Sequence, residues 1–231
     1  MAELPCMTHL MSLKKLNLSY CTLITKFPEI PTNGVLEELC LSGTQIEEVH
    51  SFVGSLEALR ELRLEDCPKL RELNLNMMMT PIEEEEQVPS SSISLLQQGL
   101  YELDVTNCTS LRSLLGLPPS LKELDASDCA SLEQVSFLDP DEDHYGGVFF
   151  DYKFNGCFKL SQDARNNIIA VATTISSQYI AKQYAMRLAK NEPRRSNLGS
   201  RRFSLHLDGS EISDKFENQS RNSSIMVKLL G

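Results

Sequence analysis

The sequence has no tryptophan, and aromatic residues make up only 6% of its 231 residues. Its seven cysteines are an odd number and include no Cys-x-x-Cys pair, so neither a disulfide framework nor a zinc ribbon is indicated. The N-terminus lacks a basic region followed by an apolar core, so we expect no signal peptide. No stretch approaches the roughly 18–20 apolar residues of a membrane span, and we expect no membrane partner.

Positive charge is also scarce, since the formal net charge is −10. Nucleic-acid binding needs a basic face, so this class of partner is disfavoured. The four histidines, His9, His50, His144 and His206, form no recognisable pairing of a base with a nucleophile. We therefore predict no enzyme activity, no cofactor and no metal, in a protein located in the cytoplasm, with the nucleus as the alternative.

Leucine supplies a recurring pattern, L-x-x-L-x-L-x-x-C, in five copies that start 23, 23, 41 and 21 residues apart. The third copy runs through Leu59, Leu62, Leu64 and Cys67. The other copies are Leu13, Leu16, Leu18, Cys21; Leu36, Leu39, Leu41, Thr44; Leu100, Leu103, Val105, Cys108; and Leu121, Leu124, Ala126, Cys129. This is the signature of leucine-rich repeats, and it predicts an α/β solenoid over residues 1–136 with short parallel strands on a concave face.

Each position in the repeat has a physical reason. The L-x-L segment is a short strand whose leucines face inward, and the residue between them faces outward. The slot filled by Cys or Thr follows the strand, where a small side chain fits beneath the turning backbone. We therefore expect Cys21, Cys67, Cys108 and Cys129 to be small core residues, whereas Cys40 lies between two leucines and should point outward.

Residues 76–99 interrupt the pattern with an acidic segment that contains Pro and Ser. Leu70, Leu73 and Leu75 could begin a degenerate sixth repeat, whose remainder would be this loop insertion. The run Glu83–Glu86 is typical of a solvated excursion, with a docking motif for a basic partner as the alternative.

The outward residues of the strands form the functional candidate of the repeat region, because stacked strands join them into one surface. Lysines head the first strand and acids dominate the last two, a charge gradient suited to a partner with basic patches. The alternative is that these are only solvated side chains. The predicted partner-binding residues are Lys15, Asn17, Glu38, Cys40, Arg63, Glu65, Glu102, Asp104, Glu123 and Asp125.

The repeat pattern stops after Phe137, and residues 137–202 are expected to hold an acidic loop, an amphipathic helix and a basic linker. The acidic loop begins like a calcium loop, but His144 and Phe150 occupy positions that need Gly and Glu. Ser161 should cap the helix, and Pro193 should stop it. Its apolar stripe, expected to pack on the end of the solenoid, is Ala164, Ile168, Ala172, Ile175, Tyr179 and Met186.

The phrases "LEELCLSGTQIEEV" and "LKELDASDCASLEQV" resemble the repeats of plant TIR–nucleotide-binding–LRR disease-resistance proteins. "FNGCFKL" is similar to the segment that leaves the last repeat in that family. Residues 203–231 resemble the start of its C-terminal jelly-roll/Ig-like domain, usually LPGSEIPxWFxxQSxGSSxxIxL, cut short at Gly231. The departures are Asp208 and Ser213 for Pro, Lys215 for Trp and Asn222 for Gly, and the loss of the aromatic should weaken packing.

The resemblance implies a protein–protein recognition segment of an intracellular immune receptor, sensing a pathogen effector or a guarded host protein and contacting the receptor's nucleotide-binding domain. It also implies contacts in the C-terminal loop at Gly209, Glu211, Phe216, Gln219 and Ser220. No TIR module or GxxxxGK[ST] phosphate loop is found, and Met1 falls inside an apparent repeat, so we expect a fragment. The alternatives are an adaptor of the F-box–LRR type, an extracellular LRR receptor fragment, or a non-functional truncated remnant.

Overall fold

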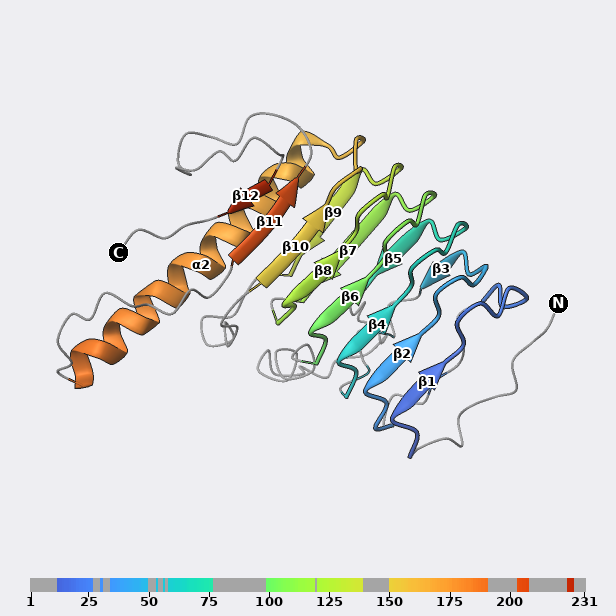
Figure 1. Cartoon of the computed structure of the whole chain (residues 1–231), viewed down its shortest axis with the longest axis horizontal. Helices are drawn as coiled ribbons and strands as arrows, with labels where there is room; N and C mark the ends of the chain where they lie inside the picture. Colours follow the sequence, from blue (N-terminus) through green and yellow to red (C-terminus); the bar gives the residue numbers. More distant parts are fainter. Residues whose placement is uncertain are drawn as a thin grey trace, which may run out of the picture.

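The computed structural model places the repeats in a curved array of parallel strands (Figure 1). It describes residues 12–26, 30, 34–49, 53, 56, 58–76, 99–118, 120–138, 150–190, 203–207 and 224–226. Within these ranges, only the backbone is described for residues 178–190, 203 and 224–226. The architecture confirms the predicted α/β leucine-rich-repeat solenoid.

The larger sheet lines the concave face and has the strand order β1-β2-β4-β6-β8-β10-β11-β12. Its strands pair in parallel from β1 to β11, and β12 is antiparallel to β11. The strands are β1 (Lys15–Asn17), β2 (Glu38–Cys40), β4 (Glu61–Arg63), β6 (Glu102–Asp104), β8 (Glu123–Asp125), β10 (Phe150–Phe154), β11 (Phe203–Leu207) and β12 (Ser224–Met226).

A second parallel sheet, with the order β3-β5-β7-β9, forms the opposite side of the solenoid. Its strands are β3 (Glu48–Val49), β5 (Glu72–Asn74), β7 (Ser113–Leu117) and β9 (Gln134–Phe137). Helix α2 (Gln162–Lys190) packs against β9, at the end of this second sheet (Figure 1). The main core lies between the two sheets.

The core is built from the leucines that the repeat pattern predicts to face inward. Leu39, Leu62, Leu103 and Leu124 occupy the central position of four successive strands, and each is at most 1% exposed. Burying such a side chain contributes roughly 1.5–3 kcal/mol, and a single coil has no partner surface for it. Stacking the coils is therefore what makes the core possible.

A left-handed residue precedes the cysteine or threonine slot in every repeat. Asp66, Asn107 and Asp128 have φ angles of 55°, 59° and 62°, in the region that Gly, Asn and Asp tolerate best. Gly43, Gly156 and Tyr20 occupy the equivalent positions in the other repeats. The backbone turns here, so the slot residue points back under the strand.

The cysteines form a ladder of hydrogen bonds between neighbouring coils. The thiol of Cys108 donates to the carbonyl oxygen of Leu64 at 3.0 Å, and Cys129 donates to Val105 at 3.1 Å. Cys67 and Cys157 donate in the same way to the third apolar residue of the preceding repeat, Leu41 and Ala126. Burial raises the pKa of Cys129 to about 12, which keeps this thiol protonated as a donor at neutral pH.

Cys21 differs from the prediction, since it is exposed. Its repeat contains β1, the first strand of the sheet among the described residues, and no earlier described coil covers it. The prediction of a buried core residue holds for Cys67, Cys108 and Cys129.

The leucines that precede the loop insertion also belong to a different part of the fold from the one predicted. Leu73 lies in β5 of the second sheet, and Leu70, Leu73 and Leu75 are buried there as the back of the third repeat. They do not begin a sixth repeat, because β4 pairs directly with β6 and leaves no strand between them. The expected loop at residues 76–99 therefore falls inside the third repeat, and residues 77–98 lie outside the described part.

The repeat sheet continues past residue 136, where we expected the repeats to end. Strand β10 pairs in parallel with β8, and Phe150, Tyr152 and Phe154 are buried at positions that leucine fills elsewhere. Gly156 and Cys157 then supply the left-handed turn and the ladder thiol. Residues 150–157 therefore begin a sixth repeat, and its aromatic residues in place of leucine hide it from a leucine pattern.

Helix α2 begins as predicted, because the hydroxyl of Ser161 accepts a hydrogen bond from the backbone N–H of Ala164 at 3.1 Å. The first part of the predicted apolar stripe is buried: Ala164, Ile168, Ala172 and Ile175 are each at most 4% exposed. The side chains of Tyr179 and Met186 lie outside the described part. No helix in the described part of the chain is long and apolar enough to cross a membrane.

Removing one central leucine should destabilise the whole stack. We expect Leu103→Ala to lower the free energy of unfolding by about 2–5 kcal/mol, because it leaves a cavity where two coils meet. The neighbouring outward variant Glu102→Ala should stay within about 0.5–1 kcal/mol. Urea denaturation followed by circular dichroism checks both, and equal effects of the two variants would contradict the shared core.

The left-handed turn of the sixth repeat makes a second prediction. Gly156 has a φ of 76°, and a Cβ atom there would lie 2.5 Å from Oδ1 of Asp128. We expect Gly156→Ala to cost about 1–3 kcal/mol of unfolding free energy. Adding Asp128→Gly should recover part of that loss in urea denaturation, whereas strictly additive effects would argue against this contact.

Candidate functional site

The register of the larger sheet gathers the predicted partner-binding residues of the repeats into two columns across the strands, except Glu65, which lies just beyond the end of β4. The first column contains the residue at the start of each three-residue strand, and the second contains the residue at its end. The first is Lys15, Glu38, Glu61, Glu102, Glu123 and Asp151, and the second is Asn17, Cys40, Arg63, Asp104, Asp125, Lys153 and His206. We call this surface the concave face.

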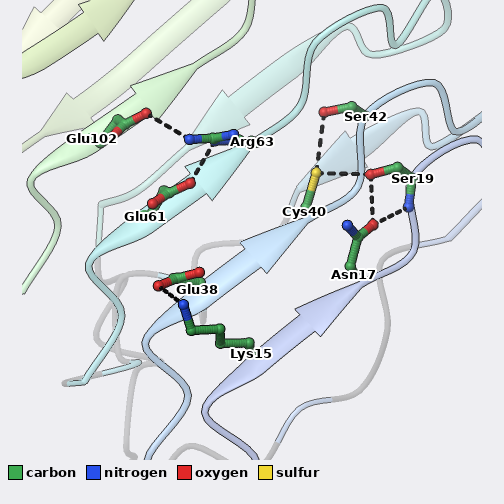
Figure 2. Close-up of polar contacts among 9 residues, drawn as sticks. All are labelled: Lys15, Asn17, Ser19, Glu38, Cys40, Ser42, Glu61, Arg63 and Glu102. Carbon is green, nitrogen blue, oxygen red and sulfur yellow. Dashed lines mark hydrogen bonds and ion pairs between the residues drawn. The ribbon is translucent and has the colours of Figure 1, made fainter.

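The two lysines at the start of the first described repeat, Lys14 and Lys15, are both paired with glutamates of the next repeat. Lys15 Nζ lies 2.6 Å from Glu38 Oε1, and Lys14 Nζ lies 2.7 Å from Glu37 Oε1 (Figure 2 shows the first pair). The hydrogen bond to Glu38 raises the pKa of Lys15, and the hydrogen bond from Lys14 lowers the pKa of Glu37. The basic end of the expected charge gradient is therefore locally neutralised.

Asn17 and Cys40 belong to a polar network that satisfies its own members (Figure 2). Oδ1 of Asn17 accepts hydrogen bonds from the backbone N–H of Ser19 at 2.9 Å and from its hydroxyl at 2.6 Å. The Cys40 sulfur lies 2.9 Å from the Ser19 hydroxyl and 3.4 Å from that of Ser42. Cys40 is thus on the concave face, as predicted.

Arg63 connects two repeats of the concave face (Figure 2). Its Nε lies 2.5 Å from Glu61 Oε1, and its Nη2 lies 3.3 Å from Glu102 Oε1. Burial and the charge of Glu102 raise the pKa of Glu61, despite the opposing effect of Arg63. Surface pairs of this kind hold side chains in place more than they stabilise the fold.

Three carboxylates near the middle of the concave face have no ion pair with a described residue, whereas Glu102 beside them pairs with Arg63. Within the described ranges, no ion pair reaches Glu65, Asp104 or Glu123. A hydrogen bond with Asp104, burial and the Asp104 charge together raise the pKa of Glu65. We call Glu65, Glu102, Asp104 and Glu123 the acidic centre.

Asp104 and Asp125 also have a structural role at the ends of their strands. Oδ1 of Asp104 accepts the backbone N–H of Thr106 at 2.9 Å, and Oδ1 of Asp125 accepts that of Ser127 at 3.0 Å. These bonds close an Asx-turn in each repeat. Substitutions here should therefore retain the oxygen acceptor.

Strands β10 and β11 extend the concave face with residues that sequence reasoning missed. Lys153 Nζ lies 3.1 Å from Asp125 Oδ2 and 3.6 Å from Asp151 Oδ2. Burial would raise the pKa of Asp125, but hydrogen bonds from Ser127 and Lys153 outweigh it and lower that pKa. The signal was present in "FDYKFNGC", which follows the repeat with aromatic residues.

Ser204, His206 and Asp151 also lie together, but they do not form a hydrolytic triad. The Ser204 hydroxyl is 2.7 Å from His206 Nε2, and Asp151 Oδ1 is 3.8 Å from the same nitrogen. A triad needs the carboxylate at the other ring nitrogen. The described residues also contain no group of three or more His, Cys, Asp or Glu side chains placed to hold a metal ion.

Tyr101 lies at one margin of the acidic centre, between cations from both neighbouring repeats. The guanidinium of Arg60 is 5.1 Å and the Lys122 Nζ 4.5 Å from its ring centroid. These cation–π contacts hold a partly exposed ring, 37% accessible, beside Glu102. The five residues predicted in the C-terminal loop, Gly209, Glu211, Phe216, Gln219 and Ser220, lie outside the described residues.

Comparison with known proteins identifies the class of the molecule. The family model for leucine-rich repeats matches residues 12–33. The leucine-rich-repeat domain of the type III effector XCV3220 (XopL) aligns with 67% of this chain and 50% of its own, at 22% identity and a TM-score of 0.43. The chain is a leucine-rich-repeat protein.

The similar sequences are plant disease-resistance proteins of Arabidopsis thaliana. Disease resistance protein RPS4B is 27% identical over 96% of this chain and 22% of its own length, and disease resistance protein RPS4 is 30% identical over 96% and 21%. Probable disease resistance protein RPP1 is 32% identical over 70% of this chain and 13% of its own.

The chain is therefore a homologue of the TIR–nucleotide-binding–LRR disease-resistance proteins. It spans about a fifth of the length of RPS4B and RPS4. The matched part is a leucine-rich-repeat region, which is not itself catalytic.

The acidic centre predicts a pH-dependent change in stability. The pKa of Glu65 is raised in the folded state, so its charge destabilises the fold above that pKa, and the effect disappears as pH falls toward the unfolded value. We expect Glu65→Gln to stabilise the protein at pH 7 by about 0.2–1 kcal/mol, the size of a cross-strand pair. Urea denaturation should show the gain shrinking toward pH 4.5, and a gain independent of pH would contradict it.

Proposed function

We propose that the chain is the recognition segment of an intracellular plant immune receptor. In this proposal the concave face contacts a pathogen effector or a guarded host protein, and contacts with the receptor's nucleotide-binding domain restrain signalling until that partner binds. The observation that carries the proposal is the concave face itself, a continuous polar surface over β1 to β11 in a homologue of disease-resistance proteins.

Three features of the described residues support a binding role for this face over a catalytic one. The buried cysteines are engaged in the ladder, the Ser–His–Asp group lacks triad geometry, and the outward columns present charged groups in regular order. A rigid sheet that displays side chains at fixed spacing suits recognition of a folded protein surface. Partner binding at this face would shift a conformational switch that is carried by other domains of the receptor.

The proposal extends to the parts of the chain that lie outside the described residues. The C-terminal loop from Gly209 to Ser220 would add partner contacts, within the residues 203–231 that were expected to begin a separate C-terminal domain, although the first of these residues form β11 and pair with β10 in the larger sheet. The cytoplasm would be the site of action, with the nucleus as the alternative, since the partners named above are met there.

The proposal predicts that partner capture depends on the concave face. With a proximity-labelling fusion of the chain in leaf cells, Glu102→Lys with Glu123→Lys should remove a set of labelled proteins, because both charges reverse without touching the Asx-turns. The matched control, Glu72→Lys with Glu133→Lys, changes exposed residues at the second sheet and should retain that set. Identical labelling by both variants and the wild type would overturn the proposal.

A further inference from the structure

Strand β11 is where residues from the C-terminal part of the chain join the repeat array. It pairs in parallel with β10 along its whole length, from Phe203 opposite Phe150 to Leu207 opposite Phe154. Its other neighbour in the sheet is the three-residue antiparallel strand β12. Strands near the end of a sheet open more readily than interior ones, so the contacts between β10 and β11 decide how firmly β11 is attached.

The outward side chains of β10 and β11 form a polar cluster at this junction. Asp151 is the register partner of Ser204, and Lys153 is the register partner of His206. The Nε2 atom of His206 lies 2.7 Å from the Ser204 hydroxyl and 3.8 Å from Asp151 Oδ1. The imidazole ring therefore lies between a hydroxyl of its own strand and a carboxylate of β10.

One carboxylate oxygen of this cluster lacks a donor. Asp151 Oδ1 is shielded from solvent and accepts no hydrogen bond from the described residues. Lys153 Nζ lies 3.6 Å from the other oxygen of Asp151 and is closer, at 3.1 Å, to Asp125 Oδ2 on β8. A buried acceptor without a donor is costly, and the ring nitrogen of His206 is placed to become that donor.

The charges of these side chains balance when His206 is protonated. Asp125 and Asp151 carry two negative charges and Lys153 one positive charge, so a neutral imidazole leaves one negative charge in excess. From β12, Ser224 lies opposite His206, and only its backbone is described. An imidazolium has an N–H at both ring nitrogens, so its Nε2 donates and its charge offsets that of Asp151.

We propose that His206 and Asp151 form a pH-sensitive latch that holds β11 on the repeat array. Histidine side chains gain their charge as the pH falls through about 6.5, and the charged ring then forms an ion pair with Asp151 across the two strands. The latch therefore stabilises the attachment of β11 at acidic pH, and this contribution is lost as the pH rises and the proton leaves. This inference goes beyond the proposed function, because it makes the β11 end of the concave face sensitive to pH whichever partner binds there.

Hydrogen exchange of backbone amides in the full chain, at about pH 5.5 and about pH 8, tests the latch on both sides of the histidine titration. Protection of the β11 amides, corrected for the intrinsic effect of pH on exchange, should be about two- to fivefold higher at the acidic pH, the size expected of a partly exposed ion pair. The amides of β2, at the far end of the same sheet, report any general effect of pH and should change less than about 1.5-fold.

Two substitutions assign the effect to the latch. His206→Gln keeps a polar side chain beside Ser204 but cannot gain a charge, and Asp151→Asn removes the charge that the imidazolium meets. Each should bring the β11 protection ratio between the two pH values to within about 1.5-fold of one, and the double variant should do no more. The matched control His144→Gln removes another histidine of the sequence and should keep the wild-type ratio.

Equal β11 protection at the two pH values in the wild-type chain would overturn the latch, and so would a pH effect that persists in His206→Gln. Circular dichroism of each variant at both pH values confirms that the fold is retained. If Asp151→Asn does not fold, the comparison of His206→Gln with the wild type and with His144→Gln decides alone. The measurement uses no partner, so its outcome is independent of the partner labelling that tests the proposed function.

Discussion

The structure depends on the contact between one coil and the next. Each coil brings leucines that it cannot bury alone, and its neighbour supplies the missing apolar surface. The same contact carries the thiol ladder, in which a cysteine of one repeat donates to a carbonyl oxygen of the preceding repeat. These residues are fully buried, and the carbonyl oxygens of Leu41, Val105 and Ala126 also accept a backbone N–H, so the thiol adds a second hydrogen bond to each of them. Packing and hydrogen bonding thus favour the same register.

The concave face is a consequence of that register. Because every strand aligns its central leucine with the next, the outward residues on either side must align as well. Ion pairs such as Lys15 with Glu38 and Arg63 with Glu102 then form between repeats. Within the described ranges they leave Glu65, Asp104 and Glu123 of the acidic centre without an ion pair. The packing of the core therefore fixes the charge pattern of the concave face, although the charged residues themselves lie outside the core.

Much of the fold was predictable from the spacing of leucines, since L-x-L indicates the strand and the following Cys or Thr indicates the turn. The prediction failed where other residues fill the same slots, as Phe150, Tyr152 and Phe154 do in β10, and where leucines of one repeat also form the second sheet, as Leu73 does. The outward residues were predictable by alternation, but their pairing was not. Which carboxylates are balanced depends on distances between repeats, and the contributions of Asp151 and Lys153 depend on recognising the sixth repeat.

The continuity of the stacked array is best tested by hydrogen exchange of backbone amides in the intact chain. Tyr152 and Phe154 lie in β10, which pairs with β8, so the amides of β10 should be as strongly protected as those of β6 and β8. The predicted result is that the protection of all three strands decreases together as the denaturant concentration increases. Rapid exchange throughout β10, with β6 and β8 still protected, would show that the array ends before it and would contradict the account.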